Sequence, residues 1–238
     1  MDKLTNEQLE KYHRHILLDN IKEEGQIKLL NTSILVVGAG GLGSTVLTLL
    51  TTTGIGRIGI IDNDIVSLSN LPRQLIYDYK DLNKLKVKAI KAKLRKKNPD
   101  VKFKLYPYRL NKDNLSIFKK YDLIIDCSDN FETKFLIDKA CEKFKKPYVS
   151  AGVSGYQGQV YTYIPKSSKP FSSLFNEIPE DTTKEYVDNG GVFPSTVTLL
   201  ASIEASEAIK YLLGNEPLSI NELFVIDLLK LHCKKIKI

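Results

Sequence analysis

The fold is decided by one short stretch, residues 34–43, which reads Ile-Leu-Val-Val-Gly-Ala-Gly-Gly-Leu-Gly. Its first four residues are too uniformly apolar for a half-exposed strand, and they predict a strand buried on both faces of a parallel sheet. The glycines follow the G-x-G-x-x-G pattern, and apolar Val46, Leu49 and Leu50 predict a helix after them. Glycines at this place let an anion approach the backbone amides of the helix N-terminus, so the stretch predicts a phosphate-binding turn.

The chain around this stretch alternates between predicted strands and helices. Apolar or alternating segments predict strands at residues 57–61, 101–105, 123–126 and 148–150. Helices are predicted at 82–97, where an apolar stripe crosses a lysine-rich segment that ends at Asn98-Pro99, and at 133–144. This rhythm is typical of the α/β class and predicts a doubly wound, mostly parallel sheet of the Rossmann-like type.

The two ends of the chain depart from that rhythm. Asn6–Leu18 has apolar residues at helical spacing and predicts an N-terminal helix. After residue 150 we expect an antiparallel strand at 160–164, an irregular segment at 165–193, a helix from Pro194 to Leu213 and a last strand at 224–226. The expectation is one domain over residues 1–238, with N-terminal helices (1–30), a nucleotide-binding part (31–150) and a C-terminal antiparallel extension (151–238).

Composition excludes several classes of protein. With 42% hydrophobic and 26% charged residues among 238, the chain has the composition of a folded globular protein. The formal net charge of +7 suits anionic partners without choosing among them. No apolar run approaches the length of a membrane span, and the N-terminus lacks the apolar core of a secretory signal, so a cytoplasmic location is predicted. Three scattered cysteines predict no disulfide framework.

Polar residues after the second predicted strand suggest what the glycine turn binds. Asp62 follows the glycine turn by close to the ~20 residues at which dinucleotide-binding folds carry an acidic residue that binds the ribose hydroxyls. Taken alone, this spacing also fits an NAD-dependent oxidoreductase. The segment Ser69–Gln74 adds an amide and the cation Arg73, which dehydrogenases do not need. Arg73 and Lys86 could neutralise a triphosphate from two sides, although periodicity does not single out Lys86 among its neighbouring lysines.

The fourth predicted strand ends in Asp126-Cys127-Ser128-Asp129-Asn130, at the edge of the sheet where open α/β folds bind ligands. Asp129 could hold Mg²⁺ between phosphates, because this ion prefers carboxylates and phosphate oxygens. A helix N-cap before Thr133 is an equally good interpretation of the same residue.

Together these segments resemble the ThiF/MoeB/HesA adenylyltransferases, bacterial relatives of ubiquitin-activating enzymes that charge small ubiquitin-like sulfur carriers. The resemblance runs from about Tyr12 to Asp227. It rests on Tyr12–His15, the glycine turn, Asp62 and Asp64, Ser69–Gln74, Lys86, Asp129-Asn130, Gly158-Gln159, and the late helix with Glu204-Ala205 and Glu207–Lys210.

The resemblance implies ATP and Mg²⁺ as cofactors, with Asp129 as the metal ligand. It implies adenylation of the C-terminal Gly-Gly carboxylate of a sulfur carrier of the thiamine or molybdopterin type, with release of pyrophosphate. It also implies a homodimer, with the N-terminal helices (1–30) at the interface and Arg14 reaching the neighbouring subunit's site. The part at 151–238 is implied to bind the carrier and to hold a crossover loop. No membrane or nucleic-acid partner is expected. The implied catalytic residues are Arg14, Arg73, Lys86 and Asp129. The implied nucleotide-binding residues are Gly38, Gly40, Gly41, Gly43, Asp62, Asp64, Ser69, Asn70, Arg73, Lys86, Asp129 and Asn130.

The chain departs from the family pattern in its cysteines. Family members usually carry two Cys-x-x-Cys pairs that bind a structural zinc, whereas Phe171–Leu174 stands at the first pair and no such pair occurs in the chain, so no zinc is expected. Residues 165–193 contain no cysteine, which disfavours a covalent carrier intermediate there. Cys127 and Cys141 are predicted to be core residues and Cys233 to be exposed. A peptide or tRNA acceptor, or a catalytically silent ATP-binding scaffold, remains an alternative.

Overall fold

The computed structural model describes residues 2–175, 191–215, 217 and 220–238, and in them eight strands form one sheet in the order β3-β2-β1-β4-β5-β6-β7-β8. Strands β1 to β5 run parallel, and β6, β7 and β8 are added antiparallel to their neighbours. This confirms the predicted mostly parallel sheet with an antiparallel C-terminal extension. The strands are β1 (Ser33–Val37), β2 (Arg57–Ile61), β3 (Lys102–Tyr106), β4 (Leu123–Asp126), β5 (Tyr148–Ser154), β6 (Gln157–Tyr163), β7 (Glu222–Asp227) and β8 (His232–Lys237).

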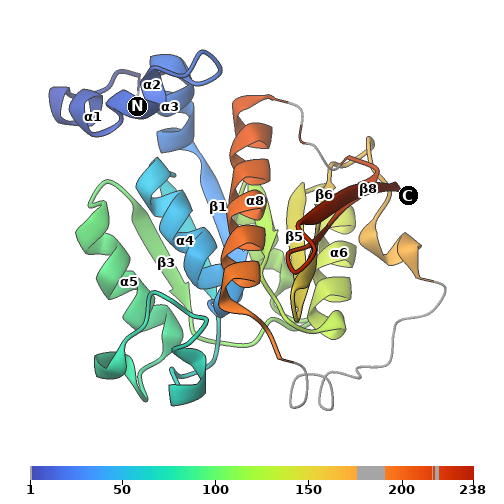
Figure 1. The fold of residues 1–238 in the computed structure, drawn as a ribbon. Coiled ribbons are helices and arrows are strands. Elements are labelled where there is room, and N and C mark those ends of the chain that lie inside the picture. The colour runs from blue at the N-terminus through green and yellow to red at the C-terminus, as the bar shows by residue number, and fades with distance from the viewer. Residues whose placement is uncertain (1, 176–190, 216, 218–219) are drawn as a thin grey trace.

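Helices cover both faces of the sheet, so the fold is doubly wound (Figure 1). Ile34 and Val36 of β1 pack in one core with α4, α5 and α8, while Leu35 and Val37 pack in a second core with α6. Successive residues of a strand face opposite sides, which explains why β1 is apolar at all four positions from Ile34 to Val37. The helices are α1 (Asn6–Lys11), α2 (His13–Ile16), α3 (Lys22–Asn31), α4 (Gly41–Thr53), α5 (Lys86–Lys97), α6 (Phe131–Phe144) and α8 (Pro194–Leu213).

The helix predicted at 133–144 begins two residues earlier, at Phe131, and two other predicted helices differ from the observed ones because of contacts with distant residues. The helix predicted at Asn6–Leu18 breaks at Tyr12, whose side chain is buried and whose hydroxyl accepts a hydrogen bond from Asn98 Nδ2 at 2.8 Å. The helix predicted from Leu82 begins at Lys86, because Leu85 is extended and forms an antiparallel bridge with Ile65. In both cases a contact with a distant part of the chain overrides the local apolar pattern.

The C-terminal part holds a strand that the sequence did not predict. Strand β8 is exposed at every position and lacks an apolar pattern, but it pairs with β7 along its whole length. The segment predicted to be irregular contains a 3₁₀ turn at Phe171–Leu174, and its residues 176–190 lie outside the described residues. Cys127 and Cys141 are buried and Cys233 is exposed, as predicted. Among the described helices, none is both long and apolar enough to cross a membrane.

The strand order reverses between β1 and β4, and this determines where a ligand can bind. The chain leaves β1 toward β2 and β3, then returns to β4 on the other side of β1. The carboxyl ends of β1, β2 and β4 therefore meet at one edge of the sheet. They bring together the glycine turn after Val37, Asp62 and the Asp126–Asn130 loop, at the switch point where open α/β sheets hold ligands.

The turn leaves no room for a side chain at Gly43, which supplies a test of the fold. A Cβ there would lie 2.0 Å from the carbonyl oxygen of Gly38, so α4 would have to shift. We expect Gly43→Ala to lower the free energy of unfolding by about 1–3 kcal/mol, measured by urea denaturation. Gly191→Ala is the control, because a Cβ at Gly191 would meet nothing within 4 Å. Equal stability of the two variants would contradict this account of the turn.

Candidate functional site

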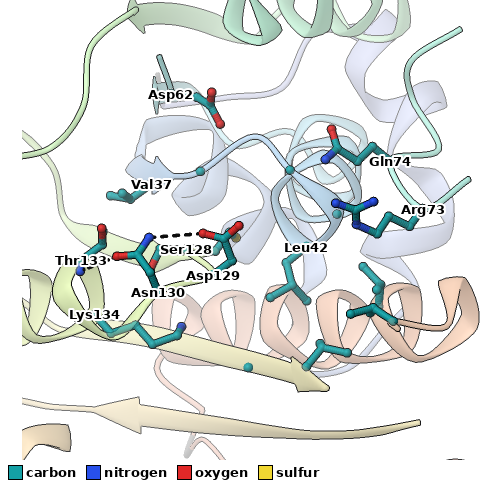
Figure 2. A pocket seen from close by; sticks show the side chains of 18 of the residues that line it. Val37, Leu42, Asp62, Arg73, Gln74, Ser128, Asp129, Asn130, Thr133 and Lys134 are labelled. Carbon is teal, nitrogen blue, oxygen red and sulfur yellow. Dashed lines mark hydrogen bonds between the residues drawn. The ribbon is translucent and has the colours of Figure 1, made fainter. Parts of the chain in front are cut away.

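A pocket of about 1020 Å³ opens at the carboxyl edge of the sheet. Residues from β1, β2, β5, β6, β7, α4, α5, α6, α8 and the loops between them, including the loop after β4, line it, and Figure 2 shows part of that lining. One cavity thus brings together residues that are far apart in the sequence. The predicted residues in the lining are Gly38, Gly40, Gly41, Asp62, Asp64, Asn70, Arg73, Lys86, Asp129 and Asn130.

Three predicted residues lie outside this lining. Gly43 supports the close packing of the turn, as described above. The Ser69 hydroxyl lies 3.0 Å from the Ser67 hydroxyl on the exposed loop before Arg73. Arg14 lies exposed on α2, at a distance from the pocket of its own chain.

The glycine turn presents the N-terminus of α4 to the pocket. Gly38 has a φ of +97°, and a Cβ there would approach the carbonyl oxygen of Cys127 to 2.7 Å, so only glycine fits. Gly41 is the first residue of α4. The positive end of the helix dipole and the first backbone amides of α4 favour an anion at this place.

Asp62 connects β2 to the glycine turn. Its Oδ2 accepts a hydrogen bond from the Ala39 amide at 2.7 Å, and its Oδ1 accepts one from the Asp64 amide at 2.8 Å. Burial raises the pKa of Asp62, an effect opposed by the charge of Lys86 and by the two amides. The carboxylate retains further lone pairs, which can accept hydrogen bonds from hydroxyl groups of a ligand.

Lys86 differs from the other lysines of α5 by its burial. Its side chain is 6% exposed, and its Nζ lies 2.8 Å from Oδ2 of exposed Asp64. The spacing of apolar residues could not distinguish Lys86 from the other lysines. What distinguishes it is that it is the first residue of α5 and lines the pocket. Arg73 lines another part of the pocket. Its Nη1 donates to the Ser69 carbonyl at 2.9 Å, and this hydrogen bond orients the guanidinium.

The Asp126–Asn130 loop is held by a buried ion pair. Asp126 is 1% exposed, and its carboxylate accepts hydrogen bonds from Ser128, from the Ser150 hydroxyl at 2.7 Å and from Lys134 Nζ at 3.1 Å. Lys134 also donates to the Ala151 carbonyl at 2.7 Å. The lysine therefore links the end of β4 to the middle of β5. Sequence reasoning missed Lys134, since nothing in the local pattern indicates that it turns inward from α6.

Asn130, and not Asp129, caps helix α6. Asn130 Oδ1 accepts a hydrogen bond from the Thr133 amide at 2.8 Å, which excludes the N-cap interpretation of Asp129. The Asp129 side chain is exposed at the pocket, where it accepts a hydrogen bond from Asn130 Nδ2 at 3.2 Å (Figure 2).

An exposed carboxylate such as that of Asp129, beside space for phosphates, suits Mg²⁺, which keeps several of its waters. Within the part of the chain that the structure describes, no three His, Cys, Asp or Glu residues lie close enough to hold a metal ion by themselves.

A second buried carboxyl group lies behind the loop. Glu204 of α8 is 0% exposed, and Cys127 Sγ donates to its Oε2 at 3.6 Å. Its Oε1 has no hydrogen-bond partner among the described residues. Burial raises the pKa of Glu204 well above its usual range, and burial with the adjacent Glu204 raises the pKa of the Cys127 thiol. A thiol in this environment stays protonated and is a poor nucleophile.

Comparison with known proteins adds independent evidence. The model of the ThiF family matches residues 12–238. A sulfur carrier protein adenylyltransferase from Thermus thermophilus is 36% identical, over 98% of this chain and 89% of its own length. A probable molybdopterin-synthase adenylyltransferase from Porphyra purpurea is 37% identical, over 87% of this chain and 55% of its own length. The chain thus spans about half of the length of some curated relatives that it matches.

Solved structures share the fold over almost the whole chain. The E. coli protein MccB, crystallised with ATP, superposes with a TM-score of 0.82 at 25% identity, and the match covers 95% of this chain and 71% of that one.

The raised pKa of Glu204 predicts a pH-dependent stability. A carboxyl group with a folded pKa above its unfolded value, about 4.3 for Glu, contributes stability that is present below the unfolded pKa and is lost as the pH rises through the folded pKa. We therefore expect Glu204→Gln to become more stable relative to the natural protein between pH 5 and pH 8, measured by urea unfolding. Exposed Glu10→Gln is the control. A difference that is constant over this pH range would show that Glu204 does not titrate as described.

Proposed function

The chain belongs to the ThiF family, and on that premise we propose that it is an adenylyltransferase that joins a protein carboxylate to the α-phosphate of ATP. The observation that carries the proposal is the single pocket that gathers the glycine turn, Asp62, Arg73, Lys86 and Asp129. This arrangement offers a ribose acceptor, two cations and a carboxylate around one anion-binding helix terminus. The names of the curated relatives support the same reaction class.

We place the nucleotide by the chemistry of the walls. The phosphates lie at the N-terminus of α4, between Arg73 on one side and Lys86 on the other. The ribose hydroxyls donate to Asp62, whose two amide contacts hold the carboxylate in place. An NAD-dependent oxidoreductase would use the turn and Asp62 in the same way, but it would leave Arg73 and Asp129 without a role.

The reaction needs positioning and charge neutralisation more than proton transfer. The acceptor carboxylate is ionised at neutral pH and attacks the α-phosphorus; the new bond is carboxyl O–P, and the bond to the bridging oxygen of pyrophosphate breaks. No general base is required. Arg73 and Lys86 offset the negative charge as the attacking and leaving oxygens share the phosphorus. Asp129 would hold Mg²⁺, which supplies neutralisation of the phosphate charge when it is bound.

The acceptor enters through the other end of the pocket. There the walls come from β5, β6 and the segment before α8, and they include Gly152, Gly158 and Gly191. Glycines at these three places leave room beside the wall for a narrow, extended chain end such as Gly-Gly. We propose a small ubiquitin-like sulfur carrier of the molybdopterin or thiamine type as the acceptor.

Arg14 completes the site from a second copy of the chain in this proposal. It is exposed on α2, and Leu17 and Leu18 beside it are 61% and 50% exposed, as side chains at an interface would be in a single copy. A two-fold dimer that covers this surface would bring each Arg14 to the partner's phosphates.

ATP–pyrophosphate exchange with Mg²⁺ tests the reaction. We expect exchange only when a carrier that ends in Gly-Gly is present, and we expect Asp129→Ala to reduce it by at least about a hundredfold, because the magnesium site is lost. Asp113→Ala is the control, since Asp113 is also exposed but lies outside the pocket. Tight ATP binding without exchange for any carrier would indicate another acceptor, such as a peptide or tRNA, or a silent scaffold.

Mixing two inactive variants tests the shared site. In a mixture of Arg14→Ala and Asp129→Ala, each mixed dimer has one site with both residues intact. About a quarter of the natural exchange activity should return when subunits exchange freely at equal concentrations. A mixture of Arg73→Ala and Asp129→Ala should recover nothing, because both residues come from the same chain. If the first mixture also stayed inactive, Arg14 would not act across subunits.

A further inference from the structure

Positive charge is concentrated in one part of the chain. Residues 82–120 contain 14 of the 35 lysine and arginine residues but 2 of the 28 aspartate and glutamate residues. The formal charge of this segment is therefore +12, and that of all other residues together is −5. The segment comprises α5, β3 and a 3₁₀ helix at Leu115–Lys120. Such an asymmetry is typical of chains that bind a polyanion.

The fold gathers much of this charge at the amino edge of β2 and β3, opposite the pocket. Arg57 begins β2 and is the register partner of Lys102, which begins β3. Arg57 Nη2 donates to the Lys120 carbonyl at 2.5 Å, which brings the end of the 3₁₀ helix to the same place. Residues 98–101 alone separate α5 from β3, so the basic last turn of α5 also ends beside this edge.

We call this surface the basic edge. It consists of exposed cationic residues, namely Arg57, Arg95, Lys96, Lys97, Lys102, Lys104, Lys119 and Lys120. Lys102 and Lys104 lie on the face of β3 opposite to Phe103 and Leu105, which pack toward α5. Because β3 is an outer strand, the basic edge extends around it on the side of the molecule far from β8 (Figure 1).

The charge of the basic edge is not neutralised within the chain. None of its residues forms an ion pair with a carboxylate of the described residues. The carboxylates nearest in sequence are already engaged: Asp100 Oδ2 lies 3.0 Å from Lys11 Nζ, and Asp122 Oδ2 accepts from the Ser33 amide at 2.8 Å. Cations can offset a helix dipole or protect an outer strand, but these roles do not explain why so many gather without ion-pair partners.

The make-up of the surface indicates which polyanion it fits. A protein interface needs an apolar centre, but among the described residues no large apolar side chain is exposed at 80–107 or 109–122. Single-stranded nucleic acid needs aromatic side chains on which its bases stack, and the basic edge has none. Helix α5 packs along the sheet, so it does not project into the major groove of DNA. Cations alone suit double-stranded RNA, which proteins recognise by its shape and its phosphates.

We propose that the basic edge binds the phosphate backbone of double-stranded RNA without reading its sequence. The resemblance to carrier-activating enzymes gave no reason to expect a nucleic-acid partner, whereas the distribution of charge in the fold does. The proposal does not depend on the proposed function. Because the basic edge and the pocket lie at opposite edges of the sheet, RNA and ATP can be bound at the same time.

Fluorescence anisotropy tests this surface, with a labelled RNA duplex of about 20 base pairs titrated with the full chain at several salt concentrations. We expect binding that weakens as salt is added. The combined variant Lys96→Gln, Lys102→Gln, Lys104→Gln should bind at least about tenfold more weakly at roughly 50 mM salt. The slope of log K against log salt concentration should fall in magnitude by about one for each of these lysines that contacts a phosphate.

A matched control removes three exposed lysines at the other edge of the sheet, in the combined variant Lys230→Gln, Lys234→Gln, Lys237→Gln. Both variants lose the same net charge, so a general effect of charge would weaken binding equally. Both should keep the natural melting temperature, because all six side chains are exposed. Equal affinity of the two variants for RNA would overturn the proposal. Binding of a DNA duplex, of polyglutamate or of phosphatidylserine vesicles that is as tight as that of RNA would also overturn it.

Discussion

The close approach of Gly38 and Gly43 is the constraint on which the rest of the structure depends. With no side chain at either residue, the chain can leave β1, turn, and begin α4 within a few residues of the sheet edge. That turn places the Ala39 amide where Asp62 can accept from it, and it lets the backbone of Gly38 lie against Cys127 at the end of β4. Three strand ends are thus fixed to one helix terminus by close backbone packing and by the Asp62 side chain.

Around this backbone the charges are arranged in two classes. Asp126 and Lys134 are both buried and hydrogen-bonded to several partners, so they form structure and leave little capacity for a ligand. Lys86, Arg73 and Asp129 each retain free donor or acceptor capacity at the pocket. Ligand binding therefore falls to the second class, while the first class holds the loop that carries Asp129 against β5.

Much of the fold and most of the pocket could be predicted because their signals are local. Buried parallel strands require uninterrupted apolar runs, and the turn requires glycines at fixed offsets, so residues 34–43 determined both. Strand β8, the break at Tyr12 and the inward turn of Lys134 were not predictable, since each depends on a partner distant in the sequence. Glu204 belongs to the same group: its contact with Cys127 joins residues 77 positions apart, and no pattern around either residue announces it.

The turn at Phe171–Leu174 shows how the C-terminal part is fixed at the place where the resemblance led us to look for a Cys-x-x-Cys pair and the chain has none. Asp138 of α6 is 1% exposed and accepts hydrogen bonds from the backbone amides of Phe171 and Ser172 at 3.0 Å each. Tyr148 of β5 donates to the same carboxylate at 2.7 Å.

Phe171 also packs with Phe135 and Phe175 at ring distances of 6.2 and 5.2 Å. The three hydrogen bonds to the buried Asp138 carboxylate fix the orientation of this turn, and the aromatic cluster buries its apolar side chains. Together they can anchor the chain on α6 and β5 at this point by packing and hydrogen bonding alone.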